Sequence, residues 1–128
     1  MFMEMIQELL DCLAEMDFYG FDEDFVNELL DSRDSEGFDG EWSRVYREIE
    51  SRKNPSVYTE ASEEEQQDIR RQAFMTVEEH VPGELSEYVS DDFGLIYDSF
   101  VLGYRDAWLD KLIAAYRSKN IPAGELHE

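Results

Sequence analysis

The C-terminal third of the chain has the most continuous hydrophobic pattern. Between Asp92 and Asn120, apolar residues form one stripe through Phe93, Ile96 and Phe100 and a second through Leu95 and Leu102. A helix that is apolar on two sides is expected to lie between other helices. The pattern therefore predicts one central helix over Asp92–Asn120, about 40 Å long at roughly 1.5 Å per residue. Gly103, inside it, indicates either close approach of a neighbouring backbone or a tolerated imperfection.

The rest of the chain shows the three-and-four spacing of amphipathic helices. Start signals separate them: Asp22 is a typical N-cap, Asp39 another, and Ser62 with Glu65 matches the S-x-x-E capping box. The expected helices cover residues 3–18, 22–30, 39–52 and 62–81, with a short helical turn at 84–89. The sequence therefore predicts an all-α, single-domain bundle of four or five helices over residues 1–120, around the long C-terminal helix. Residues 121–128 are expected to form a loose tail.

Charge is the most unusual property of the composition. The chain has 32 acidic and 11 basic residues, a formal net charge of −21. The excess lies in two blocks: residues 1–34 hold 11 acids and one base, and residues 59–92 hold 11 acids and two bases. Nucleic acid and anionic membranes would repel such a surface, so direct binding to either is excluded. The charge favours basic proteins or cations as partners, or serves solubility.

No residue pattern points to catalysis or to a cofactor. Cys12 falls within an apolar helical stripe, His80 ends an acidic run, and His127 lies in the tail. None has the spacing of metal ligands. The acidic loop at 31–40 does not match the ligand spacing of a calcium loop in either register. We therefore expect a protein that is not an enzyme and that has no catalytic residue, metal or cofactor.

The N-terminal segment MFMEMIQELL carries acids where a signal peptide carries Lys or Arg. No apolar run approaches the roughly 20 residues of a membrane span. A soluble, cytoplasmic protein is expected.

Three expected helix starts are rich in acid, and they are the candidate partner-binding site. Acids at helix starts are typical of capping and of a solvated face, but solubility needs far less than this net charge, and self-repulsion destabilises the fold. A halophilic source would also account for the excess. The candidate residues are Asp22, Glu23, Asp24, Glu60, Glu63, Glu64, Glu65, Asp68, Asp91 and Asp92.

With blocks such as DFYGFDED at 17–24 and SEEEQQD at 62–68, the chain resembles the acidic DNA-mimic inhibitors that phages and mobile elements encode, including some anti-CRISPR proteins. The resemblance is one of composition and size. It implies stoichiometric inhibition of a nucleic-acid-binding host protein, such as a CRISPR effector, by carboxylates that occupy its basic channel. The alternative is a helical interaction protein that binds a partner, or itself as a homodimer, through apolar and aromatic residues such as Trp42, Tyr46 and Tyr58.

Overall fold

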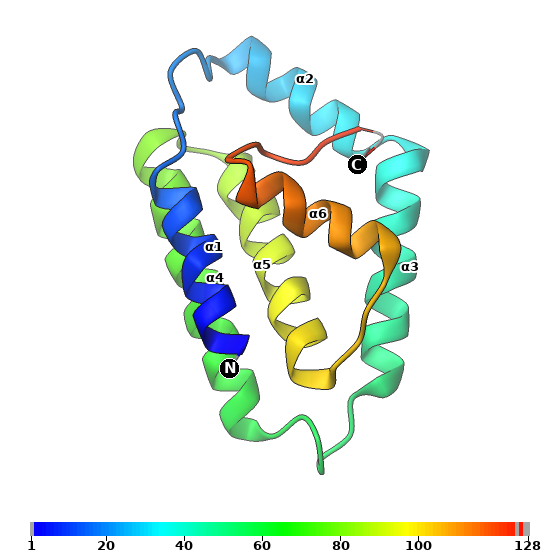
Figure 1. The fold of residues 1–128 in the computed structure, drawn as a ribbon. Helices are drawn as coiled ribbons and strands as arrows, with labels where there is room; N and C mark the ends of the chain where they lie inside the picture. The colour runs from blue at the N-terminus through cyan, green and yellow to red at the C-terminus, as the bar shows by residue number, and fades with distance from the viewer. Residues whose placement is uncertain (1, 125, 127–128) are drawn as a thin grey trace.

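The computed structural model describes residues 2–124 and 126, and it is all-α, as predicted. The described residues form six helices, so the prediction of four or five is wrong. The helices are α1 (Phe2–Ala14), α2 (Glu23–Arg33), α3 (Glu36–Arg52), α4 (Glu60–His80), α5 (Glu84–Leu102) and α6 (Ala107–Arg117) (Figure 1).

The predicted long helix over 92–120 is in fact two helices. Gly103 ends α5 in the left-handed conformation, with φ 67°, and its N–H bonds back to the carbonyls of Ser99 and Phe100. Asp106 then starts α6, and its side chain accepts a hydrogen bond from the backbone N–H of Leu109 at 3.0 Å. A left-handed glycine and a capping aspartate are the usual stop and start of helices. The expected short turn at 84–89 is the first part of α5.

The other boundaries follow local capping chemistry. Asp22 caps α2 as predicted, because its carboxylate accepts from the N–H of Phe25 at 2.9 Å. α3 begins earlier than predicted, after Ser35 rather than Asp39. In α4 the capping box is formed by Thr59 and Ser62, so the N-cap lies three residues before the predicted cap at Ser62, and the helix begins at Glu60.

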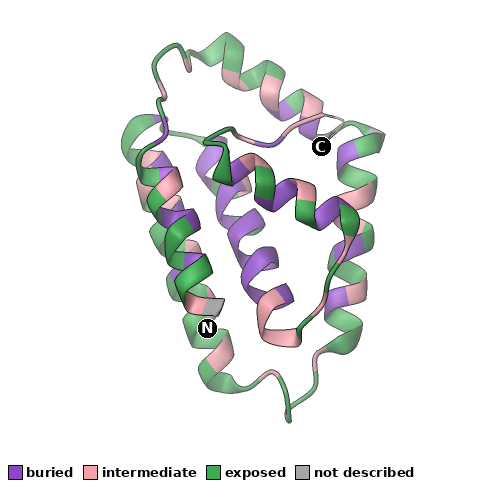
Figure 2. Cartoon of the chain, in the orientation of Figure 1, coloured by how far each residue is buried: buried purple, intermediate pink, exposed green. Residues whose placement is uncertain are grey.

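Helix α5 is the buried centre of the fold. It lies between α4 and α3, and most of its length is buried (Figures 1 and 2). α4 packs along it most extensively, while α1 packs on α4 and α6. Tyr116 brings α6 against α5, where its ring meets that of Phe93 edge-on at 5.0 Å. The central helix is therefore α5 rather than a helix at the C-terminus.

Helix α2 lies apart from this centre, across one end of the molecule (Figure 1). Only Leu30 and Arg33 of α2 are buried. The segment after α6, expected to be loose, passes close by: Pro122 is buried, and its carbonyl accepts from Arg33 Nη1 at 3.0 Å. In residues 2–124 no helix is long and apolar enough to cross a membrane.

Candidate functional site

The structure places the ten candidate residues in separate parts of the molecule. The start of α2 lies beside the α4–α5 turn, where Asp22 and Glu23 share an open hollow with His80 and Glu84. The start of α4 lies at the other end of the bundle (Figure 1). The expected third helix start at Asp91 and Asp92 does not exist, because both residues lie in the middle of α5.

The candidate carboxylates also differ in how far they are already engaged. Glu65 accepts from the Tyr97 hydroxyl, and Asp91 pairs with Arg70 at 2.6 Å. Asp68 lies 3.8 Å from Arg71. Within the described part of the chain, five other candidates are exposed and make no side-chain hydrogen bond or ion pair: Glu23, Asp24, Glu60, Glu63 and Glu64.

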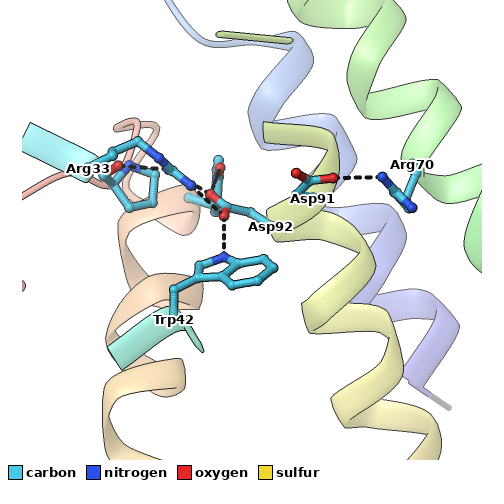
Figure 3. Close-up of polar contacts among 7 residues, drawn as sticks. Arg33, Trp42, Arg70, Asp91 and Asp92 are labelled. Atoms are coloured by element: carbon cyan, nitrogen blue, oxygen red, sulfur yellow. Dashed lines mark hydrogen bonds and ion pairs between the residues drawn. The ribbon is translucent and has the colours of Figure 1, made fainter. Parts of the chain in front are cut away.

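Asp92 is not on the surface, so its assignment to a binding face needs correction. Its side chain is 0% exposed and accepts two hydrogen bonds from Arg33, at 2.7 and 2.8 Å (Figure 3). Trp42 Nε1 donates to it at 2.9 Å and the Tyr116 hydroxyl at 2.6 Å. With these four bonds from α2, α3 and α6, the carboxylate is fully engaged inside the fold.

The buried pair has a defined protonation state. Burial alone would lower the pKa of Arg33. The charge and hydrogen bonds of the Asp92 carboxylate raise this pKa by more than burial lowers it, so the pKa of Arg33 lies above its ordinary value. Burial and the Asp92 charge raise the pKa of Tyr116 well above its ordinary value of 10.0. Arg33 is therefore charged and Tyr116 neutral at physiological pH. The network fastens α2, α3, α6 and Pro122 to the central helix.

Because this arginine points inward, all the exposed charged residues of α2 are acidic. Arg33 is the only base in residues 1–34, and it is 4% exposed. The exposed acids of α2 and its caps form the α2 acidic face, which consists of Asp22, Glu23, Asp24, Glu28, Asp31 and Asp34. Sequence reasoning missed Glu28, Asp31 and Asp34 because they lie outside the first turn of a helix. The signal that could have found them is the lone base among 11 acids.

A pocket of about 170 Å³ opens beside the C-terminal end of α2, between α2, α3 and α5. We call it the aromatic pocket. The Arg33 guanidinium lies over the ring of Phe38, at 4.4 Å from its centroid, and 5.4 Å from the ring centroid of Tyr88. Burial and the nearby Asp34 carboxylate raise the pKa of Tyr88. The pocket is lined by Arg33, Asp34, Phe38, Asp39, Trp42, Tyr88 and Asp91.

The aromatic residues of the alternative interface are partly used inside the molecule. Trp42 donates to Asp92, and the Tyr58 hydroxyl donates to the buried carboxylate of Asp98. Tyr46 is 45% exposed and stacks on Trp42 with ring centroids 5.5 Å apart. Of the three, only Tyr46 presents a large exposed ring.

Among the residues that the structure describes, the other reactive side chains do not gather into a site. His80 stacks on the Phe18 ring at 5.2 Å, and Cys12 is half-buried. His127 lies outside the described residues. Across the part of the chain that the structure describes, no group of three or more His, Cys, Asp or Glu side chains is placed to hold a metal ion.

Comparison with known proteins adds one finding. No curated protein and no solved structure matches the chain. Its sequence does match the profile of the family described as Immunity protein PIM1, over residues 6–123. The match runs from the first turns of α1 to the segment beyond α6, and so includes the buried network, the α2 acidic face and the aromatic pocket. The chain therefore belongs to the Immunity protein PIM1 family.

Proposed function

We propose that this chain neutralises a toxin by placing the α2 acidic face on a basic surface with which the toxin holds nucleic acid. An immunity protein protects a cell by binding and inhibiting a partner protein, and the family match supports that role. In this proposal the chain acts by stoichiometric binding in the cytoplasm, without catalysis and without a cofactor. A CRISPR effector is another partner with such a surface, but the family name favours a toxin.

The observation that carries the proposal is the one-sided charge of α2. Its only base faces inward and is bound to Asp92, while six acids of the α2 acidic face are exposed. Asp22 is used as the N-cap, whereas Glu23, Asp24 and Glu28 make no described side-chain hydrogen bond or ion pair. A solvated helix of an ordinary protein mixes both signs of charge.

The density of charge on this face fits a groove built for nucleic acid. Residues 22–34 span about 20 Å at 1.5 Å per residue, so six acids give one charge per roughly 3 Å. A single nucleic-acid strand carries one charge per about 3.4 Å. Rows of Lys and Arg that match a phosphate backbone would therefore meet carboxylates at a similar spacing, and like-charged surfaces would be rejected.

The start of α4 offers a second acidic cluster, with Glu60, Glu63 and Glu64 exposed. This cluster lies at the opposite end of the bundle from α2 (Figure 1), so a compact partner surface that covers α2 does not also reach the start of α4. It serves as the matched control in the test.

The test is affinity capture from a lysate of the source organism, followed by binding measurements on the retained toxin. We expect a basic, nucleic-acid-binding protein to bind at low salt and to be released as salt rises from about 0.05 to 0.5 M. The captured protein should lose its nucleic-acid binding when one equivalent of the chain is added. Failure to retain any such protein at low salt would refute the proposal.

Two variants with equal charge changes then locate the surface. Neutralising four carboxylates of α2 should abolish capture, whereas neutralising four at the start of α4 should leave it largely intact. Equal loss in both variants would mean that net charge, not the α2 acidic face, drives binding. The α2 variant is E23Q/D24N/E28Q/D31N, and the α4 variant is E60Q/E63Q/E64Q/D68N.

A further inference from the structure

We infer that the aromatic pocket receives one arginine side chain of the partner and anchors the interface formed by the α2 acidic face. The pocket adjoins this face, because Asp34 belongs to both. The inference rests on the proposed function for the identity of the partner, but the pocket's preference for a guanidinium can be tested without one.

The size of the pocket selects for a side chain. Its volume is about 170 Å³, below the roughly 300–1,000 Å³ that is usual for small-molecule sites. The head of one long side chain fills such a space, whereas a nucleotide or a similar metabolite does not fit within it.

The charges around the pocket select for a cation. Three carboxylates line it, from Asp34, Asp39 and Asp91, and Asp91 is matched by Arg70 at 2.6 Å. The positive charge of Arg33 is matched by Asp92, which lies beneath the wall. Among the described residues no Lys, Arg or His pairs with Asp34 or Asp39, so the pocket keeps two unbalanced negative charges.

The aromatic lining favours arginine over lysine. Trp42 and Tyr88 are partly exposed and line the pocket with ring surface, and a planar, weakly hydrated guanidinium stacks on such rings more readily than an ammonium. Arg33 already shows this geometry, since its guanidinium lies 4.4 Å from the Phe38 ring centroid.

The walls are held rigid before any partner arrives. Trp42 is fixed on one side by its hydrogen bond to Asp92 and on the other by stacking on Tyr46. Arg33 is fixed by Asp92 and by the carbonyl of Pro122. Side chains that are ordered in the free protein lose little entropy on binding, and rigid aromatic pockets are where a few anchor residues contribute most of an interface's affinity.

The experiment is an NMR titration of the full chain with N-acetyl-arginine amide, and with N-acetyl-citrulline amide as its neutral isostere. Trp42 and Trp108 are the only tryptophans, so the indole N–H signal of Trp42 can be assigned by substitution of Trp108. We expect saturable shifts of the Trp42 indole and the Asp39 and Tyr88 amides, with a dissociation constant of about 1–10 mM for arginine. Citrulline should bind at least tenfold more weakly.

A matched pair of variants decides whether the pocket is responsible. D34N/D39N should weaken the arginine probe at least tenfold, while E23Q/D24N, which removes the same charge from the far end of α2, should change it less than twofold. Unchanged amide dispersion in both variants would show that they are folded. Equal binding of citrulline, equal effects of the two variants, or no saturable shift of the pocket signals would overturn the inference.

These outcomes are separable from a failure of the proposed function. If the toxin is captured through α2 but the arginine probe does not shift the pocket signals, the pocket inference alone is wrong. If the probe binds as expected but no basic protein is captured, the pocket is a guanidinium site and the toxin proposal is wrong.

Discussion

Arg33 of α2 and Asp92 of α5 form a buried, two-bonded ion pair, with donor-acceptor distances of 2.7 and 2.8 Å. The pair turns the only base of the first 34 residues inward. It thereby fixes α2 to the bundle and at the same time leaves the α2 acidic face without a positive charge. Stability and the proposed binding surface thus depend on the same contact.

Replacing Asp92 by Asn should destabilise the protein strongly. The change leaves the Arg33 guanidinium buried beside a neutral amide, and breaking a buried pair in this way costs about 3–5 kcal/mol. Denaturant unfolding followed by circular dichroism measures the loss. Asp68→Asn is the control, since its pair with Arg71 is exposed and 3.8 Å long, and it should cost less than about 0.5 kcal/mol. Similar losses in both variants would mean that the buried network contributes little.

Replacing Gly103 by Ala should cost about 1–2 kcal/mol. No atom lies within 4 Å of the added methyl group, so the cost comes from the left-handed backbone, with φ 67°. Gly40 of α3 is the matched control: it also has open space for a methyl group, but its backbone is helical. Gly40→Ala should stabilise the protein by about 0.5–1 kcal/mol. If both substitutions changed the unfolding free energy in the same direction, the assignment of Gly103 as the end of α5 would be contradicted.

The same glycine shows why the sequence predicts that the long segment is helical but not that it is divided into two helices. Apolar residues continue on both sides of Gly103, so periodicity alone favours one helix. The interruption is coded by two single residues, Gly103 as a stop and Asp106 as a start, and each is weak evidence by itself. Asp22, which comes directly before an amphipathic segment, was recognisable because cap and pattern agree.

The site was harder to predict, because burial of an acid is decided by residues far away in sequence. Asp91 and Asp92 are adjacent and look alike in the sequence, yet one is exposed and the other is 0% exposed. What separates them is the set of donors around Asp92, supplied by Arg33, Trp42 and Tyr116. No local pattern brings these three residues together. The aromatic pocket was missed for the same reason.

The stability of the protein should fall above about pH 10, with Tyr116 as one identifiable cause. Its folded-state pKa is raised well above 10.0, so below pH 10 both the folded and the unfolded state keep the proton and the contribution is fully present. Above that pH the unfolded chain releases the proton while folded Tyr116 keeps it, which favours unfolding by about 1.4 kcal/mol at pH 11.

The substitution Tyr116→Phe removes this contribution. Between about pH 9 and pH 11, Tyr116→Phe should lose about 1.4 kcal/mol less unfolding free energy than the unmodified chain. Tyr19→Phe is the control for loss of a tyrosine hydroxyl, because Tyr19 is 94% exposed. If the two variants lose stability in parallel on the alkaline side, Tyr116 does not carry the effect.

Salt should have opposite effects on the free chain and on its complex. At a net charge of −21 the exposed carboxylates repel one another, and screening relieves that repulsion. Raising NaCl from about 0.05 to 0.5 M should therefore stabilise the free chain by about 1 kcal/mol, a rise in melting temperature of roughly 3–6 °C. The variant E23Q/D24N/E28Q/D31N should start from a higher melting temperature and gain less.

The same salt range should weaken the toxin complex, because the carboxylates that repel each other in the free chain are those proposed to meet the partner's Lys and Arg. A melting temperature that does not respond to salt would show that self-repulsion is already balanced within the fold, and the acidity would then need no partner to account for it.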